Sequence, residues 1–291
     1  PQMKSTRFLY GTTFGRCLLW LILKLHLDRV GVWFLHTRLS KPMISKYIRK
    51  YGIPAKAADY ATFRDFFARS RENTVDPAPE HLISPCDGLL SLFPIDENSL
   101  FHIKQSHYRV ADLVQDANLA SRFQGGVCMI FRLCPQHYHH YCYIDDGYQG
   151  ENHFIPGSLH SVQPIACETY PVYVQNRRSW CLVETDHFGP VIWTEIGAMI
   201  VGGIVNHWEN TRIRRGLEKG HFDLCGSTIV LLFQKDQVID VSIEMDETDL
   251  QDMRNYPQNE EYHAADVTVD GITVENAGIR TKGNMTLNSV A

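Results

Sequence analysis

Residues 224–233 read Leu-Cys-Gly-Ser-Thr-Ile-Val-Leu-Leu-Phe, a Gly-Ser pair followed by an apolar run rich in branched side chains. Such a run, bounded by glycine, predicts a buried strand that begins near Ser227. Glycine carries no side chain, so the carbonyl of Gly226 stands unhindered beside the serine hydroxyl. This arrangement suits attack of Ser227 on the preceding peptide bond, although Gly-Ser pairs also occur in ordinary turns. Other parts of the chain must decide between the two interpretations.

The composition is that of a globular protein with a full hydrophobic core. Of its 291 residues, 44% are hydrophobic and 21% are charged, which predicts one main domain with an appendage. The formal net charge of −5 gives no electrostatic support for nucleic-acid binding, so no such partner is expected. The eight cysteines are scattered without a C-x-x-C pair, which favours reduced thiols in a cytosolic setting.

The N-terminal part is basic and amphipathic, which favours contact with anionic lipid. Residues 16–35 read RCLLWLILKLHLDRVGVWFL, and their longest apolar run, residues 17–23, is much shorter than the about 20 residues that cross a bilayer. We therefore expect an interfacial helix with Trp20, Trp33 and Phe34 at the depth of the lipid headgroups. The alternative is a helix packed on the protein's own core.

The order of the patterns predicts an α+β fold in two parts. Residues 1–75 are expected to form the helical, membrane-associating region, with further helices at 43–51, after Pro42, and at 61–71. Residues 76–291 contain short apolar runs separated by turn residues, which predict a mostly antiparallel β catalytic domain.

Two details of that β domain follow from its turn residues. Asp186 and the Gly189-Pro190 pair mark a hairpin between two apolar runs. Residues 246–261 are polar and predict a loop or an insertion.

Four local clusters contain side chains suited to catalysis. A serine needs a base to become a nucleophile, and the base needs a carboxylate to orient it. Asp87, a histidine of residues 137–140 and Ser227 can supply these three roles. The clusters are Ser84-Pro85-Cys86-Asp87-Gly88, Tyr138-His139-His140-Tyr141-Cys142, residues 154–164 and the Gly226-Ser227 bond.

These motifs, in this order and at these intervals, resemble those of the phosphatidylserine decarboxylase family, whose members depend on a pyruvoyl group. The resemblance begins near residues 38–42, ends at Phe233 and is weak after about residue 240. The motifs that carry it are FRDFFAR at 63–69, ISPCDG at 83–88, residues 132–163, GAMIVG at 197–202, KGHF at 219–222 and the Gly226-Ser227 pair.

The resemblance implies that the chain is cleaved between Gly226 and Ser227. The products would be a β chain of residues 1–226 and an α chain of residues 227–291, which stay associated. The α chain would begin with a pyruvoyl group made from Ser227. In such enzymes the pyruvoyl carbonyl condenses with the amine of phosphatidylserine and accepts electrons as CO2 leaves, so that phosphatidylethanolamine is released.

The resemblance also implies roles for individual residues. Asp87 would orient the base, and His139 matches the first histidine of the family's Y-H-x-x-H pattern. Cys142 stands where that pattern has its second histidine, the usual cleavage base. His139 is therefore ranked first as the base, because imidazole near its free pKa suits proton transfer. His140 and His207 are additional candidates, and no metal is expected.

The leading interpretation is a carboxy-lyase, peripheral on the cytoplasmic face of a membrane. Its expected partners are the phospholipid surface and phosphatidylserine, and a homodimer is left open.

Two other functions are also considered. Cys134, His137, His139 and Cys142 are spaced as a ligand-rich cluster that suits zinc in a metal-dependent hydrolase. On a regular strand, however, the two histidines would face away from the two cysteines. The Cys142 replacement also fits a lipid-binding relative that no longer cleaves itself.

Overall fold

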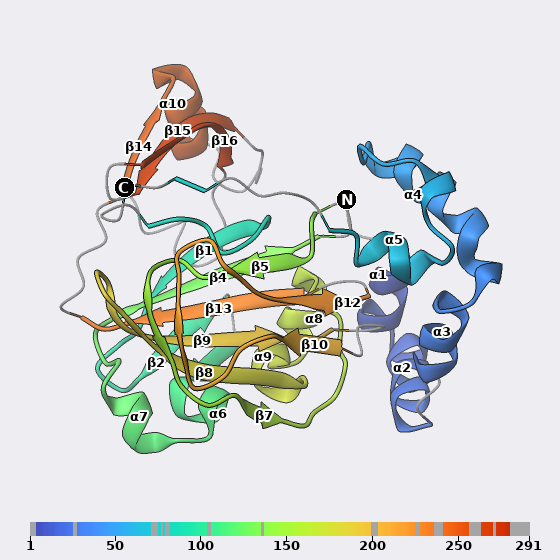
Figure 1. The fold of residues 1–291 in the computed structure, drawn as a ribbon, viewed down its shortest axis with the longest axis horizontal. Helices are drawn as coiled ribbons and strands as arrows, with labels where there is room; N and C mark the ends of the chain where they lie inside the picture. The colour runs from blue at the N-terminus through green and yellow to red at the C-terminus, as the bar shows by residue number, and fades with distance from the viewer. Residues whose placement is uncertain are drawn as a thin grey trace. The chain divides into compact units, whose positions relative to one another are not determined.

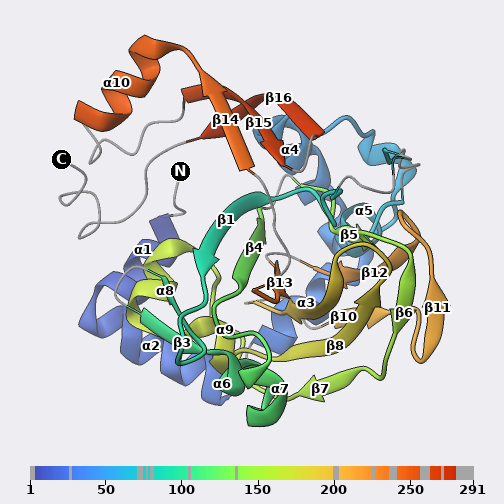
Figure 2. The ribbon, with the colours of Figure 1, turned by 90° about the vertical axis from the view of Figure 1, so that its left-hand side faces the viewer.

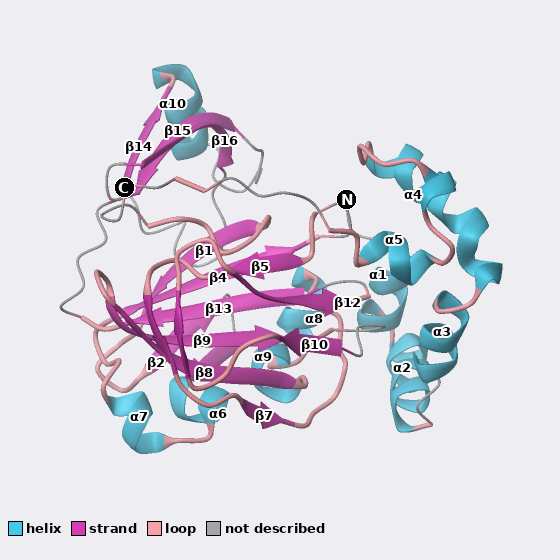
Figure 3. Cartoon of the chain, in the orientation of Figure 1, coloured by secondary structure: helices cyan, strands magenta, loops and turns pink. Residues whose placement is uncertain are grey.

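The computed structural model describes most of the chain as helices and antiparallel strands (Figure 3). Two compact units are present, one formed by residues 1–74 with 84–236 and one by residues 75–83 with 237–291. The described residues are 4–25, 28–70, 75–76, 78, 82–103, 106–134, 137–198, 203–224, 227–235, 241–255, 263–269 and 272–279.

The first unit begins with five α-helices and two short 3-10 helices. The helix expected after Pro42 is confirmed, and the one expected at 61–71 is limited to a single turn. The segment 16–35 forms two helices rather than one, with residues 26–27 outside the described part. The helices are α1 (Lys4–Gly11), α2 (Thr13–Lys24), α3 (Asp28–Leu35), α4 (Lys41–Tyr51) and α5 (Phe63–Phe67), with 3-10 helices at Arg38–Ser40 and Ala57–Asp59.

Helices α4 and α5 are fixed by local capping and by a small aromatic core. Thr62 and Asp65 form a reciprocal capping box at the start of α5, which satisfies donors that the first turn leaves free. Phe63 and Phe66 are buried in a cluster that also contains Leu224, just before the Gly-Ser pair. The N-terminal helices are therefore packed against the segment that leads into the predicted cleavage site.

A large antiparallel sheet forms the centre of the first unit, which confirms the expected α+β fold with mostly antiparallel strands. Its strand order is β1-β4-β13-β9-β8-β6-β11, and β7 also pairs with β8. The β8–β9 pair is the hairpin predicted from its turn residues. The strands are β1 (Leu89–Pro94), β4 (Val127–Leu133), β6 (Gly147–Gln149), β7 (His153–Ile155), β8 (Arg178–Thr185), β9 (Gly189–Ile196), β11 (Thr211–Ile213) and β13 (Ser227–Phe233).

Strand β13 lies inside this sheet, between β4 and β9 (Figure 1). Every one of its residues is buried, because both faces of the sheet are covered at this position. A strand buried on both faces reads as a continuous apolar run rather than as an alternation. Residues 227–233 have that pattern, and the strand predicted to begin near Ser227 is confirmed.

Short helices and a hairpin cover part of the sheet. Helix α1 packs on α8 (Figure 2). The Tyr10 ring lies against those of His160 and Tyr170. Leu19 of α2 also belongs to this core, so one side of α2 packs on the protein itself. The elements are α6 (Val110–Val114), α7 (Ala117–Ser121), α8 (Pro164–Thr169), α9 (Val172–Gln175) and the paired strands β2 (Leu100–Ile103) and β3 (Ser106–Arg109).

A second, three-stranded antiparallel sheet in the same unit has the order β10-β12-β5. Its strands are β5 (His140–Cys142), β10 (Gly203–Asn206) and β12 (Glu218–Asp223). Residue Gly220 approaches the backbone of Val205 so closely that an added Cβ would lie 2.0 Å from its carbonyl oxygen. Glycine is therefore required there for the pairing of β12 with β10.

The second unit contains α10 (Glu247–Asn255) and the antiparallel strands β14 (Val241–Met245), β15 (His263–Val269) and β16 (Ile272–Ile279). The loop predicted for 246–261 is wrong over the length of α10, and residues 256–262 lie outside the described part. Asp246 accepts a hydrogen bond from Thr248 N at 2.8 Å, and acidic side chains fill the first turn. Both features stabilise a helix start in a polar sequence.

Within the described ranges, no helix combines the length and apolarity needed to cross a bilayer.

Candidate active site

Ser227 is the first residue of β13 and is completely buried. It stands opposite Leu133 of β4, and its Oγ has no hydrogen-bond partner among the described residues. A buried hydroxyl without a partner is costly, and a reactive role is one explanation for such a group. Gly226, the other half of the predicted cleavage site, lies outside the described residues, as does Cys225.

His139 immediately precedes β5 and is also completely buried, with its ring centroid 4.1 Å from that of Phe67. Its Nδ1 lies 2.9 Å from the carbonyl oxygen of His137. A carbonyl only accepts, so Nδ1 carries the hydrogen and Nε2 keeps its lone pair. This Nε2 is buried and has no hydrogen-bond partner in the described part of the chain. His139 therefore presents a bare imidazole nitrogen to the protein interior.

Burial is the main cause that lowers the pKa of His139 to about 3. The hydrogen bond to His137 works in the opposite direction, and the nearby charges of His137, Arg69 and His140 lower the pKa further. His139 is thus neutral at physiological pH and keeps a lone pair, but its pKa is not near the free value on which its ranking as the base rested, because burial lowers it.

Asp87 contacts the backbone of residues 137–140, the segment that contains the histidines. Its Oδ2 accepts a hydrogen bond from Tyr138 N at 3.1 Å, and its charge acts to raise the pKa of His137. The pKa of His137 is nevertheless lowered, mainly by burial. The Nδ1 partner of His139 is a backbone carbonyl, so the structure brings Asp87 to the backbone before His139 and not to its ring.

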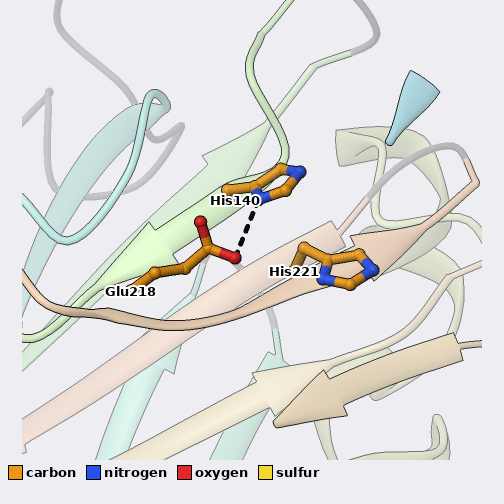
Figure 4. A group of neighbouring side chains, drawn as sticks. All are labelled: His140, Glu218 and His221. Carbon is orange, nitrogen blue, oxygen red and sulfur yellow. Dashed lines mark ion pairs between the residues drawn. The ribbon is translucent and has the colours of Figure 1, made fainter. Parts of the chain in front are cut away.

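His140, Glu218 and His221 form a cluster on the β10-β12-β5 sheet (Figure 4). His140 Nδ1 lies 3.1 Å from Glu218 Oε1, and the His140 ring is stacked on that of His221 with centroids 4.8 Å apart. His207 stands at the rim, with Nδ1 3.7 Å from the same Glu218 oxygen. Two of the sequence candidates, His140 and His207, are thereby brought together with two residues that sequence reasoning missed.

Burial and the neighbouring His140 and His207 lower the pKa of His221, although Glu218 and Asp223 act against this shift. His221 is therefore neutral in the folded protein at physiological pH.

Two guanidinium groups lie near the buried histidines. Arg69 Nη1 donates to Phe66 O at 3.1 Å, and its charge is one of those that lower the pKa of His139. Arg132 Nη1 lies 3.5 Å from Cys134 Sγ and has the same effect on His137. Cations at this position favour an anionic group in the neighbourhood of His139.

Cys142, which stands in place of the expected second histidine, is buried on β5. Burial raises its pKa to about 11, so the thiol is neutral at physiological pH. A neutral thiol is a poor base, and His139 remains the better candidate.

The zinc cluster considered for a hydrolase is not assembled. Among the described residues, the group of side chains close enough to share a metal ion is His140, Glu218 and His221 rather than Cys134, His137, His139 and Cys142. Cys134 N donates to His137 Nδ1 at 2.9 Å, so that nitrogen already has a partner. Nothing in the structure favours the hydrolase.

A family model described as phosphatidylserine decarboxylase matches residues 61–253. The chain belongs to the phosphatidylserine decarboxylase family. It is therefore placed among carboxy-lyases. The matched region includes Asp87, His139 and Ser227, and it extends beyond residue 240, where the sequence resemblance is weak.

Curated phosphatidylserine decarboxylase relatives match about four fifths of the chain. A phosphatidylserine decarboxylase proenzyme 2 of Clostridium acetobutylicum is 39% identical over 240 residues, covering 80% of this chain and 82% of the relative. A phosphatidylserine decarboxylase proenzyme of Clostridium beijerinckii is 34% identical over 255 residues, covering 82% and 86%. One of Desulfitobacterium hafniense is 33% identical over 247 residues, covering 81% and 83%.

Proposed function

We propose that this chain is a proenzyme that cleaves itself between Gly226 and Ser227 and then converts phosphatidylserine to phosphatidylethanolamine and CO2. Membership of the phosphatidylserine decarboxylase family supports the reaction, and the relatives named as proenzymes support the cleavage. The main support for cleavage at Ser227 is that its Oγ is buried at the start of a central strand and has no hydrogen-bond partner among the described residues.

The side chains of Ser227 and His139 each suit the formation of a pyruvoyl group. An ordinary buried serine gains stability from a hydrogen bond, whereas a serine that must react needs a free hydroxyl. The free Nε2 of His139 supports the role of proton acceptor for that hydroxyl. When formed, a pyruvoyl group supplies a carbonyl that condenses with the substrate amine and accepts the electrons released with CO2.

The chain's own residues would then bind and orient the substrate. Phe67 lies against the His139 ring and helps to exclude water, which strengthens electrostatic interactions there. The charge of Arg69 favours an anionic part of the headgroup near His139. Asp87 would position His139 indirectly, through its hydrogen bond to Tyr138 N.

The α and β chains would stay associated after cleavage because β13, in the α chain, would remain paired with β4 and β9 of the β chain. Residues of β13 pair with β4 along the whole strand and with β9 from Thr228 onward. A strand buried on both faces and paired on both edges does not leave a sheet without unfolding it.

Intact-mass analysis of freshly made protein tests the proposed cleavage. We expect two fragments, residues 1–226 and 227–291, and a blocked amino terminus on the smaller one. Ser227→Ala should give one chain without decarboxylase activity. Thr228→Val is the matched control, because Thr228 is the adjacent buried hydroxyl without a hydrogen-bond partner among the described residues. This variant should be cleaved normally.

Two results would contradict the proposal. One is a wild-type chain that stays uncleaved and inactive but binds liposomes, which would instead support a non-cleaving lipid-binding protein. The other is full activity in Ser227→Ala. Borohydride added with substrate should trap an adduct on the smaller fragment of the wild type.

We also propose that the N-terminal helices attach the protein peripherally to a phospholipid surface, on the cytoplasmic face. The side of α2 and α3 that does not pack on the core exposes large apolar side chains. Trp20 is 58% exposed, Trp33 is 66% exposed and Phe14 is 72% exposed. Lys24 Nζ lies 4.4 Å above the Trp20 ring, which combines a cation with an aromatic ring as interfacial helices do.

Sedimentation with phosphatidylserine-containing vesicles tests the attachment. The double variant Trp20→Gln and Trp33→Gln should bind vesicles at least about tenfold more weakly, since each exposed ring adds apolar area to the contact. Phe154→Gln is the control, because Phe154 is comparably exposed on β7. Equal vesicle binding by the wild type and the double variant would refute the attachment by α2 and α3.

A further inference from the structure

The cluster of His140, Glu218 and His221 is built by the pairing of β5 with β12. His140 stands directly opposite His221, so the two side chains share one face of the sheet. The register shifts between Glu218 and Gly220, where β12 carries a bulge. The bulge brings Glu218 to the face of His221, although the two are three residues apart. Figure 4 shows the three side chains facing one another.

The ring nitrogens of His140 have defined roles. Its Nε2 lies 3.1 Å from Ala68 O, and because a carbonyl only accepts, Nε2 carries the hydrogen in the neutral ring. The lone pair of Nδ1 is then directed at the Glu218 carboxylate, 3.1 Å away. Two groups that only accept hydrogen bonds repel each other unless a cation lies between them.

His221 shows the same lack of a partner. The Nδ1 atoms of His140 and His221 are both buried, and neither has a hydrogen-bond partner among the residues that the structure describes. Leaving two such atoms unsatisfied beside one carboxylate is unfavourable. A single divalent cation would satisfy the lone pair of His140, the charge of Glu218 and the Nδ1 of His221 in the tautomer that carries its hydrogen on Nε2.

We propose that His140, Glu218 and His221 bind a divalent transition-metal ion of the zinc class. Two imidazoles and one carboxylate are a preferred donor set for zinc. Ligand atoms around tetrahedral zinc are about 3.4 Å apart, from a metal–ligand distance of about 2.05 Å. The potential ligand atoms here lie within 4.8 Å of one another, with the closest described pair at 3.1 Å. Small side-chain rotations bring them to that spacing.

The surroundings of the cluster also fit a metal site. Ligating histidines usually donate their second ring nitrogen to a carbonyl, as His140 does to Ala68. His207, on the rim, supplies a third imidazole and so a fourth potential ligand within reach, with Nδ1 3.7 Å from Glu218 Oε1. The Glu218 side chain is 37% exposed, which leaves a path for the ion to enter.

The proposal has a consequence for the histidines of the active site. With the ion on Nδ1 and Ala68 on Nε2, both nitrogens of His140 are occupied. His140 is then a ligand that joins β5 to β12, and it is not a base for Ser227. Binding of the ion does not depend on the decarboxylase reaction, so the two proposals fail separately.

Zinc titration of the purified full chain, freed of affinity tags and stripped with a chelator, tests the site. Calorimetry, together with metal analysis after gel filtration, should give one zinc ion per chain. Glu218→Gln and His221→Asn should each weaken zinc binding by at least tenfold while the circular dichroism spectrum is retained. His36→Asn, at an exposed histidine, and Cys134→Ser, at the ligand cluster rejected above, should bind zinc as the wild type does.

Cobalt substitution gives a readout that does not require the variants to fold. Cobalt(II) in the wild-type protein should show visible bands of a four- or five-coordinate site, without the near-ultraviolet band of a thiolate ligand. Binding of less than about 0.1 ion per chain would overturn the proposal. A thiolate band, or loss of binding in Cys134→Ser alone, would overturn it in favour of the cysteine cluster.

Discussion

Lys219 Nζ lies 2.5 Å from Glu195 Oε1, and both side chains are completely buried. Lys219 also donates to Asn206 Oδ1 at 3.0 Å, while Asn206 Nδ2 lies 3.3 Å from Glu195 Oε2. The three residues belong to β12, β9 and β10, so this network joins the three-stranded sheet to the large sheet. It holds the strand that carries Glu218 and His221 against the strand beside β13.

Glu195→Ala should destabilise the protein by about 3–5 kcal/mol, because it leaves the ammonium group of Lys219 buried without its counter-charge. The double variant Glu195→Leu with Lys219→Met should lose less than the sum of the single variants, since neither charge is then left alone. Urea unfolding followed by circular dichroism measures both values. A loss below about 1 kcal/mol in Glu195→Ala would show that the pair is not needed for stability.

His139→Gln should slow self-cleavage by at least about a hundredfold, the smaller end of the range for a general base. Glutamine keeps a polar side chain of similar length but accepts no proton. The rate is measured from the appearance of the fragment 227–291 after synthesis. His153→Gln, at a histidine stacked on Trp180, is the comparison and should leave the rate unchanged. Equal rates in all three proteins would exclude His139 as the base.

The stability of the protein should fall as the pH drops below about 6.5, the usual pKa of histidine. Burial lowers the pKa of His160, so between 6.5 and the folded value the unfolded chain binds more protons than the folded chain. His160→Gln removes this contribution and should show a smaller loss between pH 7 and pH 5. Urea unfolding at each pH measures the difference, and parallel curves for the two proteins would contradict the assignment.

Thiol reagents should distinguish the cysteines by exposure. Cys17 is exposed on α2, whereas Cys142 and Cys181 are buried, and burial raises their pKa values to about 11 and about 12. At pH 7 the reagent should modify Cys17 first and leave the two buried thiols unmodified until the protein unfolds. Peptide mass mapping identifies the modified residues. Rapid labelling of Cys142 in the folded protein would be inconsistent with the buried β5.

The sequence was sufficient for elements whose pattern is set by burial. The run 227–233 predicts β13 because a strand covered on both faces needs apolar side chains at every position. The β8–β9 hairpin and the helix after Pro42 follow from turn residues and from the position of proline. Each of these elements is determined by residues that are close together in the sequence.

Features that depend on distant residues were missed. A regular strand would place Glu218 and His221 on opposite faces, and only the bulge in β12 puts them together. The backbone carbonyl of His137 as the partner of His139 Nδ1 also has no signal in the sequence, which indicated only Asp87 as the group that orients the base. The buried pairing of Lys219 with Glu195 has no local signal either, because both residues are ordinarily exposed.

The central position of β13 has a consequence for the order of folding and the proposed cleavage. A strand paired with β4 on one edge and β9 on the other is placed most readily while the chain is one piece, so the proposed cleavage would follow folding. Once cut and denatured, the protein would be two molecules that must meet again, and its refolding rate would rise with protein concentration. The uncut Ser227→Ala chain would refold at a rate independent of concentration. The uncut chain could therefore unfold and refold alone, whereas the cleaved protein would recover its fold only if its two chains met again.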